Sequence, residues 1–557
     1  MPSKKNILLA SLFISIIYST FASQPEPSGW KWLQEWFKSW FTTPQQPTSF
    51  KKAVAASGKS LDLFNFYEHK EKKQLAAPDK KNSFMDAISA ADTFKKAVRK
   101  NKSIMERLKN NPNKFLFGAS SSSYQYEGGL DSNNANAIFY QSKGLKPAGI
   151  AIDFWNRYEK DIELMDSKLG INCFRLSIAW DRVQLTRESW NQNAINTYVK
   201  MIKLLRAYDI EPIVVLHHYT IPQWFAEIGG FEKRENIKYF VEFAKKMYEA
   251  LHEDVTYWST FNAIEGYAFK GYWTQDGPPG LHNMQLTQTV MAHMIDAHVE
   301  TYQAIKGPNG MYHIFDTKNI PKPQIGLQKN IVPLDPSEKS NICVRTISGP
   351  FCIMGATMQN KCFFDLFNTG IFEMKIPKWI NILHINTFAK DSIDWIGVNI
   401  YSKMEMRFAK TIPESRPKFK TANINYRDYP EGIYRAVKTI YDNIARPLGI
   451  PIIITENGIA PVDDNDEQRT RFFRRALYTI RKLIEEGYPI IGYTPWASHD
   501  NYEWPSQTQP DPYDRPYGMF KVNFDKISPD YMKRTLKKGA EYYRDFIKEY
   551  FKQQASF

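Results

Sequence analysis

The chain has 557 residues, of which 43% are hydrophobic and 15% aromatic, a composition too apolar for a disordered protein. Its net charge of +14 is uneven, because residues 1–114 carry 20 Lys and Arg against 9 Asp and Glu, whereas the remainder carries 53 against 50. The nearly neutral body argues against a nucleic-acid groove. The basic N-terminal part is compatible with contact to an anionic surface.

The first residues have the pattern of an export signal. Two lysines, Lys4 and Lys5, precede an apolar run over residues 7–21. The run ends in a small-x-small sequence, Thr20-Phe21-Ala22. It is shorter than the about 20 apolar residues that span a bilayer. We therefore predict a signal peptide over residues 1–22, with an uncleaved anchor as the alternative. The protein is expected to be exported, as a secreted, periplasmic or membrane-associated protein.

Residues 23–110 are predicted to form a partly helical N-terminal extension. Residues 24–29 and 42–48 are rich in Pro, Ser, Thr and Gln, which is typical of linkers. Between them, residues 30–41 contain four Trp, with apolar residues near helical spacing on one face. Trp with Lys is typical of a helix that lies on a membrane surface, and a helix docked on the body is the alternative. Residues 50–110 have a polar, mostly helical pattern without a recognised motif.

Beyond residue 110, apolar runs with β-strand character alternate with amphipathic helical stretches. Eight alternations predict an α/β fold, a closed (β/α)8 TIM barrel over residues 111–557. An open doubly wound sheet is disfavoured, because no Gly-rich phosphate loop follows the first run. The runs cover residues 115–121, 172–180, 211–219, 257–263, 324–331, 392–401, 451–457 and 490–498.

Polar and aromatic residues gather at the C-terminal ends of these runs, where barrel enzymes build their active sites. Two of the segments are especially informative. Residues 453–458 read Ile-Ile-Thr-Glu-Asn-Gly, and residues 259–267 read Ser-Thr-Phe-Asn-Ala-Ile-Glu-Gly-Tyr. The residues at the ends of the runs are Gln125, Arg175, His218, Asn262, Tyr401, Glu456 and Trp496.

In order along the chain, these segments resemble glycoside hydrolase family 1, the β-glucosidase family. The resemblance spans about residues 114–548 and implies a retaining β-glycosidase-like hydrolase on a TIM barrel. Such an enzyme uses two carboxyl groups about 5–5.5 Å apart, one as nucleophile and one as acid and base. Further matches lie at residues 115–128, 174–180, 216–224, 399–401 and 496–504.

The residues also fit this chemistry one by one. Glu456 matches the nucleophile, which traps the sugar as a covalent ester. Arg175 supplies a fixed positive charge that favours the ionised carboxylate, and Tyr401 can donate a hydrogen bond that orients it. The predicted substrate-binding residues are Gln125, His218, Asn262, Trp496, Glu503 and Trp504.

Glu503 and Trp504 bear on the choice of sugar. In the branch of the family that hydrolyses phosphorylated sugars, Ser and Lys replace residues in this segment to hold the phosphate. This chain keeps Glu-Trp, which implies a neutral β-linked sugar with a glucose-like or galactose-like ring. The expected partner is therefore a carbohydrate substrate, and no cofactor is expected.

The four cysteines, Cys173, Cys343, Cys352 and Cys362, have no metal-ligand spacing, and no metal is expected. Scattered buried thiols are the favoured interpretation. Cys343 and Cys352 could instead close a small disulfide loop in an oxidising compartment.

The acid/base position is substituted. Where the family has Thr-Phe-Asn-Glu-Pro, this chain has Ala263 and Ile264 after Asn262. An alanine cannot transfer a proton, and positioned acid–base help is worth about 10²–10⁴-fold in rate. Glu265 is a weak candidate for a replacement, and a carboxylate at the start of a helix is the favoured interpretation of it.

Two further interpretations concern the whole chain. In one, the enzyme cleaves glycosides with good leaving groups without a side-chain acid, or transfers the sugar to another acceptor. In the other, the barrel is a non-catalytic carbohydrate-binding pseudoenzyme. A binder has little need for a charge at the nucleophile position, so the retained Glu456 favours an enzyme with altered acid–base chemistry.

Overall fold

The computed structural model describes residues 83–552, apart from residues 316–319, 339, 341, 377–378, 408–409 and 414–418. All of these belong to one compact unit, residues 63–557. The predicted signal over residues 1–22 and the Trp-rich segment at residues 30–41 lie outside the described residues.

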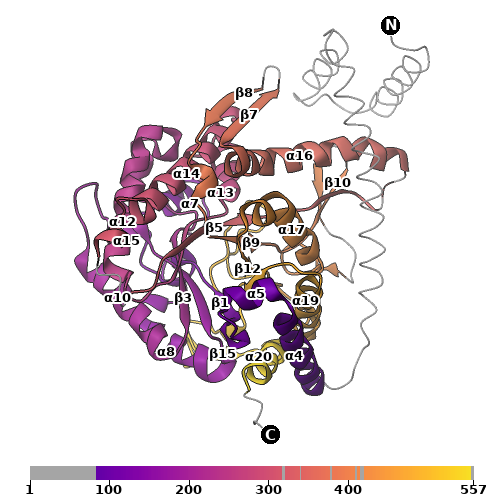
Figure 1. The fold of residues 1–557 in the computed structure, drawn as a ribbon. Helices are drawn as coiled ribbons and strands as arrows, with labels where there is room; N and C mark the ends of the chain where they lie inside the picture. The colour runs from indigo at the N-terminus through magenta and orange to yellow at the C-terminus, as the bar shows by residue number, and fades with distance from the viewer. Residues whose placement is uncertain are drawn as a thin grey trace. The chain divides into compact units, whose positions relative to one another are not determined.

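Eight parallel strands close into a barrel (Figure 1), which confirms the predicted fold. Each of the eight apolar runs contains one strand, and the strand order around the barrel is β1-β13-β12-β9-β5-β4-β3-β2. The strands are β1 (Leu116–Ser120), β2 (Cys173–Ser177), β3 (Glu211–His217), β4 (Tyr257–Asn262), β5 (Gln324–Asn330), β9 (Trp395–Asn399), β12 (Ile452–Glu456) and β13 (Ile490–Tyr493).

A long helix follows each barrel strand and covers the outside of the barrel. Barrel strands are therefore buried on both faces, which explains why β12 is apolar up to its last two residues. The covering helices are α8 (Phe154–Leu164), α10 (Gln192–Ala207), α12 (Ile237–Leu251), α14 (Met284–Lys306), α16 (Ile342–Thr369), α17 (Gly432–Ile440), α19 (Glu467–Glu485) and α20 (Glu541–Phe551).

Shorter elements lie in the connections. They include three small sheets, formed by β6, β10 and β11, by β7 and β8, and by β14 and β15. The short strands are β6 (Leu334–Pro336), β7 (Ile371–Ile376), β8 (Ile380–Ile385), β10 (Met404–Arg407), β11 (Lys410–Ile412), β14 (Phe520–Val522) and β15 (Arg534–Leu536). The short helices are α6 (Ser123–Tyr126), α7 (Ala135–Ser142), α9 (Trp180–Val183), α11 (Gln223–Glu227), α13 (Ile264–Tyr272), α15 (Met311–Ile314) and α18 (Arg446–Leu448).

Two helices precede the barrel and pack on it. They are α4 (Ser83–Lys100) and α5 (Lys102–Arg107), and α4 lies against α19 and α20 (Figure 1). Phe94 of α4 is buried, with ring-centroid distances of 5.3 Å to Phe115 and 5.5 Å to Phe546. The helical part of the predicted extension thus contributes to the core beneath the barrel.

Three of the cysteines are described with their side chains. Cys173, Cys352 and Cys362 are free and buried. Because Cys352 is a free thiol, the disulfide loop with Cys343 that the sequence allowed is not formed. Within the described part of the chain, no helix has both the length and the apolar character needed to cross a membrane.

Candidate active site

Glu456 ends β12, and both of its carboxylate oxygens accept hydrogen bonds. Arg175 of β2 donates from Nη1 to Oε1 at 2.7 Å, and Tyr401 donates from its hydroxyl to Oε2 at 2.7 Å. The side chain of Arg175 is fully buried, and Glu456 is 6% exposed. Burial, followed by the charge of Glu456, raises the pKa of Tyr401 well above its usual range, so the phenol stays protonated as a donor. The carboxylate is therefore fixed at the C-terminal rim of the barrel.

The two residues after Glu456 fix the backbone that carries it. The Asn457 side-chain amide donates to the carbonyl of Ile400 at 2.6 Å, and its oxygen accepts from the Tyr493 hydroxyl at 3.1 Å. A Cβ built on Gly458 would lie 2.0 Å from the carbonyl oxygen of Trp496. Glycine is thus required there for the chain to pass the end of β13.

Asn262, at the end of β4, links Arg175 to His218. Its Oδ1 accepts from Arg175 Nη2 at 2.7 Å and from Asn399 Nδ2 at 2.8 Å, and its Nδ2 lies 3.0 Å from His218 Nε2. Burial, and then the charge of Arg175, lowers the pKa of His218 well below its usual range. A neutral His218 that accepts from Asn262 at Nε2 carries its proton on Nδ1. That buried Nδ1 has no hydrogen-bond partner among the described residues, and Nε2 lies 4.0 Å from Glu456 Oε1, so the imidazole borders the carboxylate.

Gln125 lies beside the other predicted sugar ligands, but its side-chain amide is occupied. Its Nε2 donates to Asn501 Oδ1 at 3.0 Å and to the carbonyl of Tyr502 at 2.8 Å, and its Oε1 accepts from the Ser122 hydroxyl at 2.8 Å. In this state Gln125 positions the segment that leads to Glu503.

Glu503 is a second buried carboxyl group in the site. Its Oε1 accepts from the indole nitrogen of Trp496 at 2.9 Å. Burial raises the pKa of Glu503 to about 7, with Arg515 the largest opposing influence. Arg515 donates to the carbonyls of Trp504 at 3.3 Å and Asp511 at 3.1 Å. The sequence analysis did not identify Arg515, which fixes the loop that presents Glu503 and Trp504.

Aromatic side chains form the walls around these groups. Trp504 stacks on Tyr124 with ring centroids 5.6 Å apart, and it meets the edge of Tyr219 at 5.7 Å. Tyr426 stacks on Tyr401 at 5.5 Å. The sequence analysis missed Tyr219 and Tyr426 as site residues. Tyr219 directly follows His218 in the matched segment 216–224, which was the available signal for it.

The acid/base position itself carries no proton donor. Ala263 is fully buried in a left-handed conformation (φ 46°), and its backbone N–H donates to the carbonyl of Gln328 at 2.9 Å. Helix α13 begins at the next residue, Ile264, which is also buried.

Glu265, in the first turn of α13, has one of its two carboxylate oxygens engaged. Its Oε1 accepts from the backbone N–H of Asn330 at 2.6 Å and lies 3.2 Å from Lys329 Nζ. Neighbouring strand residues project from opposite faces. Gln328 accepts from Ser259 of the adjacent β4, so Lys329 projects to the other face of β5.

The other face of β5 is directed toward the helices that surround the barrel. Cys362 of α16 is among the electrostatic neighbours of Lys329. Glu265 thus forms a buried ion pair between the barrel wall and these helices. The helix-start interpretation of Glu265 stays a prediction, which the leaving-group series tests.

Lys270 enters the site from α13. Its ammonium lies 5.0 Å from the ring centroid of Tyr219 and 5.4 Å from that of Trp504. A Cβ built on Gly266, one turn earlier, would lie 2.6 Å from the Tyr219 hydroxyl oxygen, so Tyr219 runs along this face of the helix. Lys270 was not among the predicted site residues.

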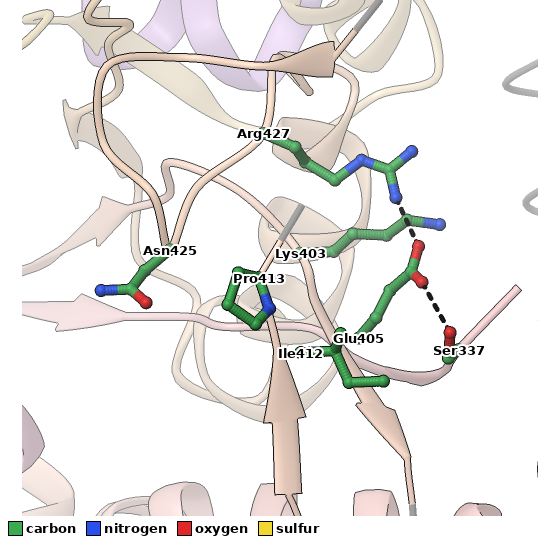
Figure 2. Close-up of a pocket in the computed structure, with 7 residues that line it drawn as sticks. All are labelled: Ser337, Lys403, Glu405, Ile412, Pro413, Asn425 and Arg427. Carbon is green, nitrogen blue, oxygen red and sulfur yellow. Dashed lines mark hydrogen bonds and ion pairs between the residues drawn. The ribbon is translucent and has the colours of Figure 1, made fainter. Parts of the chain in front are cut away.

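Figure 2 shows a separate cavity, which is lined by Ser337, Lys403, Glu405, Ile412, Pro413, Asn425 and Arg427. Arg427 Nη1 donates to Glu405 Oε1 at 2.8 Å, and the Ser337 hydroxyl donates to Glu405 Oε2 at 3.1 Å. Lys403 Nζ donates to Glu338 Oε1 at 2.7 Å. This cavity shares no residue with the site around Glu456. Among the described residues, no cluster of three or more His, Cys, Asp or Glu could hold a metal ion.

Comparisons with known proteins agree with the geometry. The model of Glycosyl hydrolase family 1 matches residues 108–551. A 6-phospho-beta-galactosidase of Staphylococcus haemolyticus (strain JCSC1435) is 26% identical over 494 residues, which cover 79% of this chain and 98% of the relative.

Solved structures give the same result. A beta-glycosidase from Pyrococcus horikoshii matches with 30% identity and a TM-score of 0.65, covering 79% of this chain and 95% of that one. A beta-glucosidase from Exiguobacterium marinum shares the fold with a TM-score of 0.68 at 24% identity, covering 79% of this chain and 99% of its own.

Proposed function

The chain belongs to glycosyl hydrolase family 1, whose enzymes hydrolyse O-glycosyl bonds, and we propose that it is a retaining β-glycosidase with Glu456 as its nucleophile. The main observation behind this proposal is the fixed carboxylate of Glu456. Its Oε1 accepts a hydrogen bond from Arg175 Nη1 and its Oε2 accepts one from the Tyr401 hydroxyl, each at 2.7 Å. A carboxylate with both oxygens fixed at a barrel rim is arranged for attack on an anomeric carbon.

The reaction has two steps. A Glu456 oxygen bonds to the anomeric carbon while the bond from that carbon to the departing oxygen breaks, which gives a covalent glycosyl ester. Water then attacks the same carbon from the opposite side and releases Glu456. Two inversions give net retention of configuration. His218, Asn262, Glu503 and the two tryptophans, Trp496 and Trp504, surround the sugar in this proposal.

The substitution at Ala263 changes which substrates react readily. Without a carboxylic acid at this position, glycosides with good leaving groups need the least help in the first step. Without a base there, water is activated less in the second step, so an alcohol or an anionic nucleophile competes for the glycosyl ester. The proposal therefore includes transglycosylation.

We further propose a neutral β-linked sugar as the substrate, although 6-phospho-beta-galactosidases of two Staphylococcus species are among its relatives. Glu503 is buried beside Trp496, and its carboxyl group suits sugar hydroxyls. Once ionised, it would repel a phosphate on the same sugar. Hydrolysis rates measured side by side on aryl β-glucosides, aryl β-galactosides and their 6-phosphate forms test this choice of substrate.

A carbohydrate-binding pseudoenzyme is the second candidate, and the buried Ala263 favours it. A 2-deoxy-2-fluoro-β-glycoside of dinitrophenol distinguishes the two, because its leaving group needs no acid. The enzyme is expected to accumulate a glycosyl ester that peptide mass spectrometry locates on Glu456. Absence of any ester with both glucose and galactose configurations would support the pseudoenzyme.

For location, we propose an exported protein held at a membrane surface through residues 30–41. The Lys-flanked apolar run at residues 7–21, the four Trp and the basic N-terminal charge support this. Sedimentation with anionic vesicles at low salt tests it, by comparing the mature chain with one that lacks residues 24–48. The proposal fails if both forms remain in the supernatant.

A further inference from the structure

Lys270 is a cation inside the site that the proposed reaction has not yet used. Its ammonium lies over the rings of Tyr219 and Trp504, at 5.0 Å and 5.4 Å from their centroids. Among the described residues its ammonium makes no hydrogen bond or ion pair, and the residue is partly exposed. Its long side chain therefore keeps a free proton donor beside these two rings.

Lys270 and Gly266 lie one turn apart in α13 and therefore share a face of the helix. Tyr219 lies along this face, because a Cβ built on Gly266 would lie 2.6 Å from its hydroxyl oxygen and the Lys270 ammonium lies 5.0 Å from its ring centroid. Ala263, the position of the lost acid, directly precedes α13, so Lys270 is carried by the helix that begins beside that position.

Charge also ties Lys270 to the reacting groups. Burial lowers the pKa of its ammonium, and the carboxylates of Asp276, Glu503 and Glu456 oppose that shift in decreasing order. The nucleophile is thus close enough to influence Lys270 electrostatically. Lysines with lowered pKa act as acids and bases near neutral pH.

The other proton donors nearby are less suitable. Glu265 Oε1 accepts from the backbone N–H of Asn330 and lies 3.2 Å from Lys329 Nζ, and Glu503 accepts from Trp496 at 2.9 Å among the sugar ligands. The Tyr219 hydroxyl lies on the correct face, but burial raises its pKa well above the usual range, which weakens it as an acid.

We propose that Lys270 is a catalytic residue that donates the proton to the departing oxygen in place of the missing glutamate. The proposal rests on Glu456 being the nucleophile. In the first step, Glu456 bonds to the anomeric carbon and the bond to the departing oxygen breaks. The Nζ proton passes to that oxygen and leaves a neutral amine. In the second step, the amine takes a proton from the attacking water or alcohol as the glycosyl ester breaks, which restores the ammonium.

The test is the dependence of kcat/KM on the leaving group, measured with alkyl and aryl glycosides for the parent chain, Lys270→Met and Lys270→Arg. Both variants are expected to lose about 10²–10⁴-fold on alkyl glycosides and little on dinitrophenyl glycosides. Arginine keeps the charge but cannot release a proton at neutral pH, so it separates proton transfer from charge. Lys200→Met, on the exposed side of α10, is the control.

The outcomes are distinct. An equal loss on all leaving groups, or a change in KM alone, would overturn the proposal and make Lys270 a binding residue. A selective loss in Tyr219→Phe but not in Lys270→Met would overturn it in favour of Tyr219. Glu456 labelling by the dinitrophenyl 2-fluoro glycoside must persist in Lys270→Met. Failure of that labelling in the parent chain would instead remove the proposed function.

Discussion

Arg175 and Glu456 form a buried ion pair with 2.7 Å between Nη1 and Oε1, and the arginine side chain is fully shielded from water. Because its Nη2 also donates to Asn262 at 2.7 Å, one guanidinium orients both the nucleophile and the neighbouring amide. The pair joins β2 to β12 across the barrel rim.

Arg175→Met is therefore expected to damage both stability and chemistry. Removing one member of a buried pair leaves the other charge uncompensated, at a cost of about 3–5 kcal/mol in the free energy of unfolding. Denaturant unfolding measures this cost, and the rate of Glu456 labelling measures the chemical loss. The double variant Arg175→Met/Glu456→Gln should recover part of the stability but none of the labelling. A fully stable Arg175→Met would contradict the role of the pair.

Restoring the family sequence at the acid position should recover hydrolysis of poor leaving groups. Ala263→Glu with Ile264→Pro returns a carboxylic acid and the residue that normally follows it. In the Lys270→Met background, where neither proton donor remains, the gain is expected to approach about 10²–10⁴-fold on alkyl glycosides and to be small on dinitrophenyl glycosides. The single change Ile264→Pro is the matched control, and steady-state rates on both substrate types give the result. An equal gain on both types would show that the acid does not limit the rate.

The barrel could be predicted from the sequence because its signals are local. Each apolar run is long enough to form a strand buried on both faces, and each is followed by an amphipathic helix. The strand ends that carry the site were predictable for the same reason, since Glu456 and Asn262 are the last residues of β12 and β4.

Pairings between distant segments could not be predicted in this way. The partner of Glu265 is Lys329, and their contact depends on β4 and β5 being neighbours in the barrel. The occupied amide of Gln125 depends on the loop after β13. The placement of Lys270 over Tyr219 depends on the direction of α13, which the single residue Ala263 sets through its left-handed conformation.

Glu265→Ala is expected to lower stability without changing the leaving-group dependence. Lys329 has a fully buried side chain and would lose its charge partner, at a cost of about 3–5 kcal/mol. Adding Lys329→Met removes the uncompensated charge and should recover much of the lost free energy of unfolding. Denaturant unfolding and the leaving-group series together give the answer. A selective loss on alkyl glycosides in Glu265→Gln would show that Glu265 reaches the substrate after all.

The last prediction concerns the pH dependence caused by Glu503. Burial raises its pKa from 4.5 to about 7 in the folded chain. Below pH 4.5 the group is protonated in both the folded and the unfolded chain. Between pH 4.5 and 7 it is ionised only in the unfolded chain, so its contribution to the free energy of unfolding falls as pH rises through this window. Above pH 7 the difference is constant.

Glu503→Gln removes this titration while it keeps an oxygen that can accept from Trp496. The difference in unfolding free energy between parent and variant should therefore change between pH 4.5 and 7 in the direction that favours the variant at higher pH. The same ionisation should affect substrate binding, because the carboxylate accepts sugar hydroxyls more strongly than the acid does. KM of the parent chain for a dinitrophenyl glycoside should fall as pH rises through about 7, and KM of Glu503→Gln should not. If the parent and the variant show the same pH dependence of unfolding free energy and of KM, Glu503 does not titrate between pH 4.5 and 7 in the folded chain.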